Sequence, residues 1–505
     1  MHFNGRKFIM FYTSTRDKSV KVTASQAIVK GISAEGGLFV PEEFPKIDLK
    51  KLEELAELDY RQRAKYILSL YLTDFTQEEI DCCVEGAYAP GKFSSDETAP
   101  VKKVGDKYVQ ELWRGPTCAF KDMALQLLPH LLTVSAGKSA KDREIVILVA
   151  TSGDTGKAAL EGFKDVKNTK ILVFYPSDGV SPMQKLQMMT QEGENVGVCA
   201  IRGNFDDAQS GVKAIFTDGE IAAKLNEKGM QFSSANSINW GRLVPQVVYY
   251  ISAYCDMMKK GEIKSGDKIN IVVPTGNFGN ILAAYYAFRM GLPVNRFICA
   301  SNSNNVLTDF IKTGTYDKNR KFFTTSSPSM DILISSNLER LLFHIFGNDD
   351  SKVRDCMSLL SSEGKYSLSD EDHKKITEYF DGGFCGDMET FEEIRDNFSE
   401  YGYLFDTHTA VAVRVYNDYV KRTGDKTPAV IASTANPYKF SASVLKALSP
   451  EEKVENEFEA VEAVHRFTGV ECPKQLATLK DKKPRFTGVC EKSEMTKAVF
   501  EMLDI

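Results

Sequence analysis

The sequence predicts an α/β protein in which parallel β-sheets are covered by helices on both sides. Six short apolar runs have the continuous hydrophobic character of strands that are buried on both faces. Each run is followed by a loop of small and polar residues and then by a helical pattern. This repeated order favours parallel pairing, and ligands on such sheets bind at the carboxyl ends of the strands.

The elements follow in order along the chain. Residues 1–95 are a predicted N-terminal subdomain, in which 36–41 form a turn and an extended piece and 50–72 are helical. Residues 96–450 are the predicted αβ core. Its strands are expected at 144–150, 170–175, 195–201, 268–273, 296–300 and 429–433, with helices beginning near 157, 182, 206, 280, 304 and 438. The acidic stretch 348–401 is a predicted helical insertion in the core, and 451–505 a predicted helical C-terminal appendage.

Composition excludes several functional classes. The 505 residues are 43% hydrophobic and 26% charged, with a net charge of -6 and no long Lys/Arg run, so no nucleic acid is expected as a partner. No apolar stretch reaches the length of a membrane span, and no signal-peptide pattern is present. Ten scattered cysteines without a C-x-x-C pattern indicate reduced thiols and a cytoplasmic protein. The six histidines form no metal-binding pattern, so no metal is expected.

A lysine lies at the end of a Gly-Pro turn in the segment Arg114–Asp122. A helical pattern, with a kink expected at Pro129, begins just after Lys121. The positive end of a helix dipole, together with partial burial behind Phe120, favours a neutral amine there. A neutral amine can attack an aldehyde. The alternative is an ordinary solvated lysine, and only the neighbouring loops favour the first interpretation.

Two loops have the character of anion sites at helix N-termini. Thr151–Gly156 follows a buried strand and offers backbone N–H groups and hydroxyls to a carboxylate or phosphate, although Asp154 or Thr155 could simply cap the helix. Pro274–Asn280 has two glycines that permit close approach to a phosphate, although a plain turn is the alternative. Neither nucleotide-binding glycine motif occurs in the chain.

Two further loops and two isolated residues complete the candidates. Ser234–Arg242 groups amides and an arginine at a helix start, as an anionic ligand requires, with capping by Asn239 as the alternative. Ser433–Pro437 ends the last buried strand, where a hydroxyl could meet a ring nitrogen or the chain could merely turn. Cys118 has no histidine partner and is predicted to pack in the core. His408 is predicted to belong to the start of a helix.

Together these loops closely resemble those of threonine synthases, in the family's order, from about Tyr12 to Leu448. The long leading subdomain and the acidic stretch resemble the fungal-type branch. The matching pieces are Gly-Gly-Leu-Phe-Val-Pro (36–41), Gly-Pro-Thr-x-Ala-Phe-Lys-Asp (115–122), Ser-Gly-Asp-Thr-Gly (152–156), Asn-Ser-Ile-Asn-Trp-Gly-Arg (236–242), Gly-Asn-Phe-Gly-Asn (276–280) and Pro-Ser-Met-Asp-Ile-Leu (328–333).

The resemblance implies a fold type II, pyridoxal-5'-phosphate-dependent enzyme, similar to the β-subunit of tryptophan synthase, with a large and a small αβ domain in residues 96–450. Lys121 matches the family's Schiff-base lysine and its catalytic acid/base. The other implied contacts are as follows: the cofactor phosphate with Gly276, Asn277, Phe278, Gly279 and Asn280; the pyridine nitrogen with Thr434; the substrate carboxylate with Ser152, Gly153, Asp154 and Thr155; and the substrate phosphate with Asn239 and Arg242.

The implied reaction converts O-phospho-L-homoserine and water into L-threonine and phosphate, with the cofactor as electron sink and with domain closure to exclude water. The chain would be a carbon–oxygen lyase acting on phosphate, as a monomer or small homo-oligomer. Three alternatives stay open: a phospho-lyase like the threonine-synthase-like proteins of animals, a dehydratase, or a non-catalytic ligand-binding protein of the same fold. Arg114 departs from the family, which commonly has histidine there; it could aid phosphate binding or pack outward.

Overall fold

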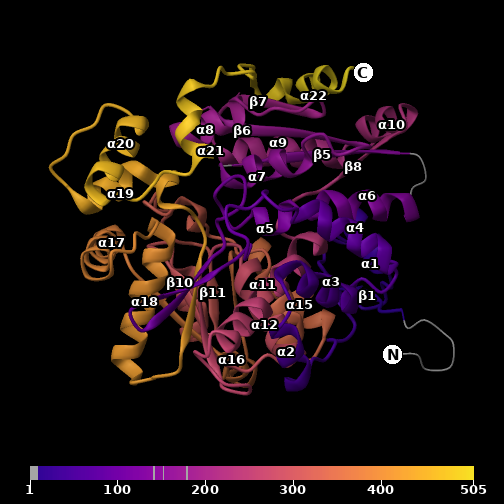
Figure 1. Cartoon of the computed structure of the whole chain (residues 1–505). Helices are drawn as coiled ribbons and strands as arrows, with labels where there is room; N and C mark the ends of the chain where they lie inside the picture. The colour runs from indigo at the N-terminus through magenta and orange to yellow at the C-terminus, as the bar shows by residue number, and fades with distance from the viewer. Residues whose placement is uncertain (1–8, 140–142, 152, 178–179) are drawn as a thin grey trace.

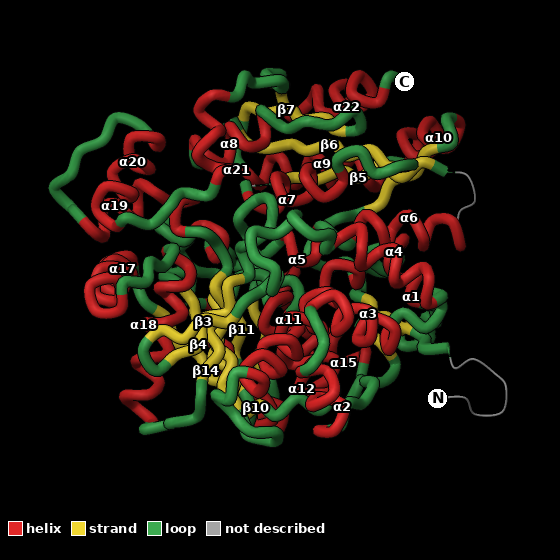
Figure 2. The backbone as a smooth tube through the Cα atoms, in the orientation of Figure 1, coloured by secondary structure: helices red, strands yellow, loops and turns green. Residues whose placement is uncertain are grey.

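The computed structural model describes residues 9–139, 143–151, 153–177 and 180–505 (Figure 1). Two sheets, one of six strands and one of five, form the framework. Figure 2 shows the strands gathered at two separate levels with helices between and around them. The predicted α/β architecture is confirmed. None of the helices in the described residues combines the length and apolar character needed to cross a bilayer.

The five-stranded sheet has the order β15-β7-β6-β5-β8, and all its pairs are parallel. Its strands are β5 (Glu144–Ala150), β6 (Thr169–Pro176), β7 (Val196–Arg202), β8 (Met230–Ser233) and β15 (Val489–Glu491). The helices packed around it are α7 (Asp154–Phe163), α8 (Pro182–Met189), α9 (Phe205–Thr217), α10 (Gly219–Glu227) and α22 (Met495–Leu503). The central strands are apolar on both faces because helices cover both.

The six-stranded sheet has the order β13-β10-β9-β14-β4-β3 and is parallel except for the β3–β4 pair. Its strands are β3 (Val101–Val104), β4 (Lys107–Glu111), β9 (Ile269–Pro274), β10 (Val294–Ser301), β13 (Phe380–Phe384) and β14 (Ala429–Ser433). Helices packed near it include α11 (Trp240–Lys259), α12 (Gly279–Met290), α13 (Val306–Thr313) and α18 (Thr407–Thr423). The strands β9 and β14, which precede two of the candidate loops, are therefore neighbours.

The N-terminal segment packs on α11 and shares its core. It contains β1 (Tyr12–Ser14), α1 (Ala24–Lys30), β2 (Phe39–Pro41), α2 (Leu49–Ala56), α3 (Tyr60–Tyr71) and α4 (Gln77–Ala87), and β1 pairs antiparallel with β2. The ring centroids of Tyr12 and Tyr71 lie 5.0 and 5.5 Å from that of Trp240 on α11. Arg63 pairs with Asp256 on the same helix at 2.6 Å. This segment therefore supports the helix that carries one of the candidate site residues.

The helix predicted to begin at Met123 is divided into α5 (Asp122–Leu125) and α6 (Leu128–Ser139). The break falls just before Pro129, which lacks the N–H that a continuous helix needs. Helix α5 lies between the two sheets, in contact with α7 on one side and α11 on the other (Figure 1). A Cβ atom on Gly162 of α7 would lie only 2.0 Å from the carbonyl oxygen of Leu125, so these two helices touch backbone to backbone.

The acidic segment 348–401 is not purely helical. It contains α15 (Asp350–Ser362), β12 (Lys365–Ser367), α16 (Asp370–Thr377), β13 and α17 (Asp387–Tyr401). Strand β13 pairs in parallel with β10 as the edge of the six-stranded sheet, and β12 pairs with β11 (Thr315–Asp317). The sequence of β13, Phe-Asp-Gly-Gly-Phe, lacks the apolar run of the other parallel strands because Gly382 and Gly383 lie within it. Helix α14 (Leu338–Ile345) precedes the segment.

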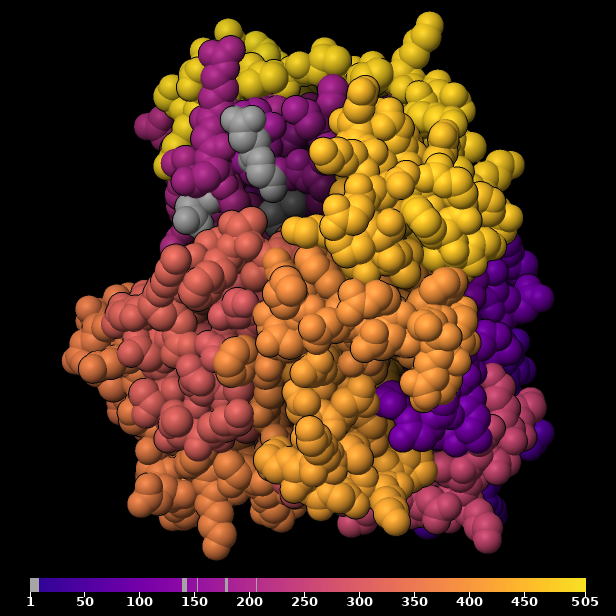
Figure 3. Space-filling view, turned by 90° about the vertical axis from the view of Figure 1, so that its left-hand side faces the viewer, coloured from indigo at the N-terminus to yellow at the C-terminus, as the bar shows by residue number. Residues whose placement is uncertain are grey.

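The C-terminal segment reaches both sheets. Helix α19 (Ser441–Leu448) packs against α20 (Glu457–Thr468), and the chain continues through α21 (Lys474–Ala477) to β15 and α22. Strand β15 pairs with β7, and α22 buries Val499 and Leu503 beside the five-stranded sheet. Figure 3 shows this segment, in yellow, along the top and the upper right of the molecule, above the orange part of the chain. It therefore includes a strand in addition to helices.

Candidate functional site

The loop that carries Lys121 is fastened to the loop that follows β14. The N–H of Phe120 donates to the carbonyl oxygen of Thr434 at 2.8 Å, and the N–H of Asn436 donates to the carbonyl oxygen of Cys118 at 3.0 Å. The side chain of Thr434 is nearly buried, and its hydroxyl has no hydrogen-bond partner among the described residues. The loop of Lys121 and the loop that follows β14 thus meet, and the hydroxyl of Thr434 remains available to a ligand.

The amine of Lys121 faces a charged cluster. Its Nζ lies 3.9 Å from Oδ2 of Asp154, and its side chain is 14% exposed. Burial lowers the pKa of Lys121 to about 8; the cations Lys439 and Arg242 also lower it, whereas Asp154 and Asp122 act in the opposite direction. A substantial fraction of neutral amine near pH 8 is what an aldehyde-reactive lysine requires.

The carboxylate of Asp154 is held by a second lysine that sequence reasoning missed. Lys439 Nζ lies 2.7 Å from Oδ1 of Asp154 and donates to the carbonyl oxygen of Thr117 at 3.0 Å. Gln184 donates to the same carboxylate oxygen at 2.9 Å. Burial alone would raise the pKa of Asp154, but Lys439 and Lys121 hold it well below its usual range. Lys439 follows β14 in a short 3-10 helix (Pro437–Phe440), and no sequence signal marks it as buried.

The loop before α12 leaves its donors uncapped. Phe278 is the N-cap of α12 in the left-handed conformation (φ 62°), and no side chain caps the helix. Asn280 accepts hydrogen bonds at Oδ1 from the hydroxyls of Tyr249 and Tyr250, whereas its Nδ2 is buried without a partner. A Cβ on Gly276 would lie 2.8 Å from the carbonyl oxygen of Ser329, so only glycine fits there. A buried helix start with free donors favours an anion.

Arg242 is a buried cation without a carboxylate partner in the described part of the chain. Its Nη1 donates to the carbonyl oxygen of Ala235 at 2.6 Å, its Nε has no partner, and its side chain lies on α11. Burial lowers its pKa to about 10. An unpaired buried guanidinium is costly unless a ligand supplies the negative charge.

Asn239 has the structural role considered as its alternative. Its Oδ1 accepts from the N–H of Gly241 at 2.8 Å, which caps α11. Its Nδ2 donates to the carbonyl oxygens of Ile28 and Ser234 at 3.0 and 2.8 Å. Because both amide protons are used and the residue is fully buried, its predicted contact with a substrate phosphate has no support.

The start of α7 offers backbone donors rather than a side-chain cap. Gly153, at φ 143°, is the N-cap without a side-chain hydrogen bond, and Thr155 in the first turn is partly exposed. The hydroxyl of Thr151 accepts from the N–H groups of Gly153 and Gly156 at 3.0 and 2.9 Å and so shapes the loop. Ser152, also predicted for this loop, lies outside the described residues.

A histidine and a serine, which sequence reasoning missed as site residues, form a chain of hydrogen bonds that ends at Asp154. The Nε2 of His408 accepts from the N–H of Ser329 at 3.1 Å, and its Nδ1 lies 3.0 Å from Asp406. This pattern places the imidazole proton on Nδ1. The hydroxyl of Ser329 in turn donates to Oδ2 of Asp154 at 3.4 Å. His408 does lie at the start of α18, as predicted, and it also fixes the 328–333 loop.

Arg114 and Cys118 each lack a group that is free to react at the site. Arg114 pairs with Glu111 at 2.6 Å and stacks on Trp113 at 4.3 Å, so its charge is already neutralised. Tyr403 donates to the other oxygen of Glu111 at 2.7 Å. Burial raises the pKa of the Cys118 thiol to about 12, which keeps it protonated and unreactive.

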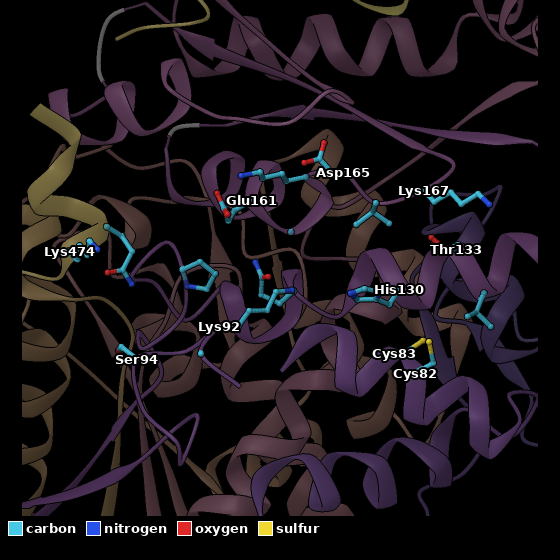
Figure 4. A pocket seen from close by; sticks show the side chains of 18 of the residues that line it. Cys82, Cys83, Lys92, Ser94, His130, Thr133, Glu161, Asp165, Lys167 and Lys474 are labelled. Carbon is cyan, nitrogen blue, oxygen red and sulfur yellow. The ribbon is translucent and has the colours of Figure 1, made fainter. Parts of the chain in front are cut away.

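A cavity of about 1020 Å³ lies away from this cluster, at the opposite ends of α5 and α7 (Figure 4). Its lining includes Lys92, His130, Glu161 and Lys474, and none of the predicted site residues contributes to it. The volume of this cavity therefore does not mark the position of the predicted site. No group of three or more His, Cys, Asp or Glu side chains in the described ranges could hold a metal ion.

The donor set fits pyridoxal phosphate. Lys121 supplies a partly neutral amine, the uncapped start of α12 and the free Nδ2 of Asn280 suit a phosphate, and the hydroxyl of Thr434 is available to a ring nitrogen. The Lys121 loop follows β4, the start of α12 follows β9, and Thr434 follows β14. All three therefore lie beyond the carboxyl ends of strands in the six-stranded sheet, where ligands of α/β sheets bind. Fold and site define a pyridoxal-phosphate-dependent enzyme of fold type II.

Comparison with known proteins narrows the class. Family models match residues 11–88 (threonine synthase N terminus), 99–434 (pyridoxal-phosphate dependent enzyme) and 409–499 (threonine synthase, C-terminal). Threonine synthase of Pseudomonas aeruginosa is 37% identical, over 87% of this chain and 90% of its own. The PLP-bound threonine synthase from Brucella melitensis superposes with a TM-score of 0.87 at 34% identity, over 98% and 99% of the two chains.

The chain belongs to the threonine synthase family. It also resembles human threonine synthase-like 1, with 42% identity over 86% of this chain. It spans only 60% of the length of that relative.

Proposed function

We propose that this chain is a threonine synthase, which converts O-phospho-L-homoserine and water into L-threonine and phosphate with pyridoxal phosphate. The observation that carries the proposal is the buried cluster in which the Lys121 amine lies 3.9 Å from Asp154, while the Arg242 guanidinium beside it has no carboxylate partner among the described residues. A substrate that brings a phosphate supplies the negative charge that Arg242 lacks.

The proposed contacts divide the substrate and cofactor among the loops. Backbone N–H groups at the start of α12, within Gly276–Asn280, hold the cofactor phosphate, and Thr434 faces the pyridine nitrogen. The N–H groups at the start of α7 bind the substrate carboxylate. The side chain of Asp154 takes no part in that contact, because it is an anion already paired with Lys439. Arg242 binds the substrate phosphate.

Lys121 is the proposed acid and base. Bound pyridoxal phosphate would supply an electron sink for the loss of protons from carbon. The amine of Lys121 takes protons from Cα and Cβ and returns protons to Cγ and Cα, while the γ-phosphate leaves with the C–O electron pair. Water adds its hydroxyl at Cβ, and its remaining proton goes to the released phosphate. Because water must stay out before elimination, closure of the five-stranded domain on the six-stranded domain belongs to the proposal.

Product analysis tests this proposal. Purified protein loaded with pyridoxal phosphate is incubated with O-phospho-L-homoserine, and threonine and phosphate are measured together. Equal amounts of L-threonine and phosphate are expected. Absence of threonine while the cofactor is bound would overturn the proposal.

A phospho-lyase is the second candidate, because the identity to human threonine synthase-like 1 (42%) exceeds that to the Pseudomonas threonine synthase (37%). Such an enzyme would release phosphate and form 2-oxobutyrate without threonine. A dehydratase would act on an unphosphorylated hydroxy amino acid instead. A non-catalytic protein of this fold would turn over none of these compounds. The same assay separates all four once 2-oxobutyrate is also measured and an unphosphorylated hydroxy amino acid is supplied as a second substrate.

We also propose a cytoplasmic location, supported by ten cysteines that are all free. The proposed organisation is an N-terminal subdomain (1–95), a catalytic core (96–450) and a C-terminal appendage (451–505). The family matches at 11–88 and 99–434 support a boundary near residue 95, whereas the C-terminal match, 409–499, begins within the proposed core.

A further inference from the structure

Lys439 is a fully buried charge beside the site, and nothing in the proposed chemistry uses it. Its side chain is 0% exposed and that of Asp154 is 4% exposed. A lysine is almost never fully buried unless it is paired. Here the pair is an ammonium and a carboxylate 2.7 Å apart, at the contact between the loop after β14 and the start of α7.

The ammonium joins three loops of the site. It contacts Asp154 of the 151–156 loop and the carbonyl oxygen of Thr117 in the Lys121 loop, and Lys439 itself follows Thr434. Its 2.7 Å contact is with Oδ1 of the carboxylate, to which Gln184 also donates. Oδ2 is therefore the oxygen that faces Lys121, at 3.9 Å.

The charges around Lys121 come from four elements. They are Asp122 on α5, Asp154 on α7, Arg242 on α11 and Lys439 after β14. Asp122 accepts hydrogen bonds from the N–H and hydroxyl of Thr117, and burial raises its pKa to about 6. The nearest anion to Lys121 is thus Asp154, and that anion already has a closer cation.

We propose that Lys439 is the counter-ion of Asp154 and thereby leaves Lys121 free to be a neutral, nucleophilic amine. A buried carboxylate needs one nearby positive charge. If Lys439 did not supply it, Lys121 would have to keep its proton in order to do so. The two lysines then have separate tasks: Lys439 is a positioning residue that neutralises Asp154, and Lys121 reacts.

The inference rests on the proposed role of Lys121, and its test measures that amine directly. Full-length protein freed of cofactor, and checked for native circular dichroism, is acetylated with trace acetic anhydride across a pH series. Mass spectrometry of the peptide that contains Lys121 gives the pH midpoint of its reactivity. The rate at which added pyridoxal phosphate develops its visible absorbance at pH 7 is a second readout.

Lys439→Met is expected to raise the midpoint of Lys121 by about one pH unit or more, because Lys121 becomes the counter-ion of Asp154. A shift of one unit lowers the neutral fraction at pH 7, and hence cofactor incorporation, about tenfold. The double variant Lys439→Met/Asp154→Asn removes both charges and returns the midpoint to near the wild-type value. A merely structural role for Lys439 would not produce this rescue.

Lys157→Met is the matched control. Lys157 is also a buried lysine on α7, paired with Glu161 at 3.0 Å, but it is not among the charges that act on Lys121. It should leave the midpoint unchanged. If Lys439→Met does not fold, Asp154→Asn serves instead: it leaves Lys439 unpaired beside Lys121 and should lower the midpoint.

Two results would overturn the inference. One is an unchanged midpoint in folded Lys439→Met, or in Asp154→Asn where the first variant does not fold. The other is a double variant that shifts as far as Lys439→Met alone. The proposed function fails separately, if replacement of Lys121 leaves the absorbance of bound cofactor intact, because acetylation is measured without cofactor.

Discussion

Replacing Gly162 by alanine will separate the two helices that begin in the site. Helix α5 starts directly after Lys121, and α7 starts at Asp154. They touch where Gly162 faces the carbonyl oxygen of Leu125, and a Cβ there would lie 2.0 Å from that oxygen. An ordinary contact begins at 3.4 Å, so the helices would have to move apart by about 1.4 Å. The obstacle is backbone, which cannot rotate away as a side chain can.

The stability cost and the activity cost should differ. Forcing an extra methyl into a packed contact costs about 1–3 kcal/mol, and the better helix propensity of alanine offsets about 1 kcal/mol of that. A net loss of up to about 2 kcal/mol is expected. Misplacement of catalytic groups by about 1 Å can cost a factor of roughly 100 in rate. Because Lys121 and Asp154 are only 3.9 Å apart, we expect kcat/KM to fall by about 10- to 100-fold.

Urea unfolding and threonine formation from O-phospho-L-homoserine are measured on the same preparations. Gly137→Ala is the control, since Gly137 is an exposed residue of α6 with nothing within 4 Å of the added methyl. It should keep wild-type kcat/KM and unfold at the same or slightly higher urea concentration. The reasoning is refuted if Gly162→Ala behaves like Gly137→Ala in both assays.

Three other outcomes are expected. Lys121→Ala should abolish both threonine formation and the visible absorbance of bound cofactor; a variant that keeps this absorbance would refute the assignment of Lys121. Arg242→Met removes a buried unpaired cation, so the cofactor-free protein should melt at the same or a higher temperature, while KM for O-phospho-L-homoserine rises about 10- to 100-fold; an unchanged KM would contradict its proposed role. The cofactor-free wild type should gain stability relative to Lys121→Met as the pH rises from 8 to 10, by at most about 1.4 kcal/mol per unit, in urea unfolding at each pH. The sign follows because the folded amine loses its proton near pH 8, whereas the unfolded amine keeps it to about pH 10.4, so the unfolded state binds more protons between these values.

The parts of the fold that the sequence predicts best are those with uniform burial. Strands β5 and β14 have the predicted bounds, because both faces of a central parallel strand are apolar. Strand β4 was not predicted, because its sequence ends in Gln110 and Glu111. Both are buried, but each has a polar partner distant in sequence: Gln110 donates to the carbonyl oxygen of Tyr249, and Glu111 accepts from Tyr403. The residues around β4 in the sequence do not show that these distant partners exist.

The site divides in the same way. Loops that owe their chemistry to the backbone, such as Gly276–Asn280, are legible from glycines placed between a strand and a helix. Residues that act through another side chain are not. Lys439 becomes relevant only when the fold brings it to Asp154, 285 positions earlier in the numbering. The predicted contact of Asn239 with a substrate phosphate has the same limit. The amide of Asn239 donates to the backbone carbonyl of Ile28, which lies in the N-terminal segment, and the sequence around Asn239 does not show this partner.

The path of the C-terminal segment limits how far one sheet can move relative to the other. Its helix α20 belongs to the same hydrophobic cluster as strands of the six-stranded sheet, and its strand β15 pairs with β7 of the five-stranded sheet. Any motion of one sheet relative to the other must therefore stretch the chain between α20 and β15 or separate β15 from β7. Removing residues 451–505 would release this link and would also expose the backbone edge of β7, which would then be free to pair with other chains.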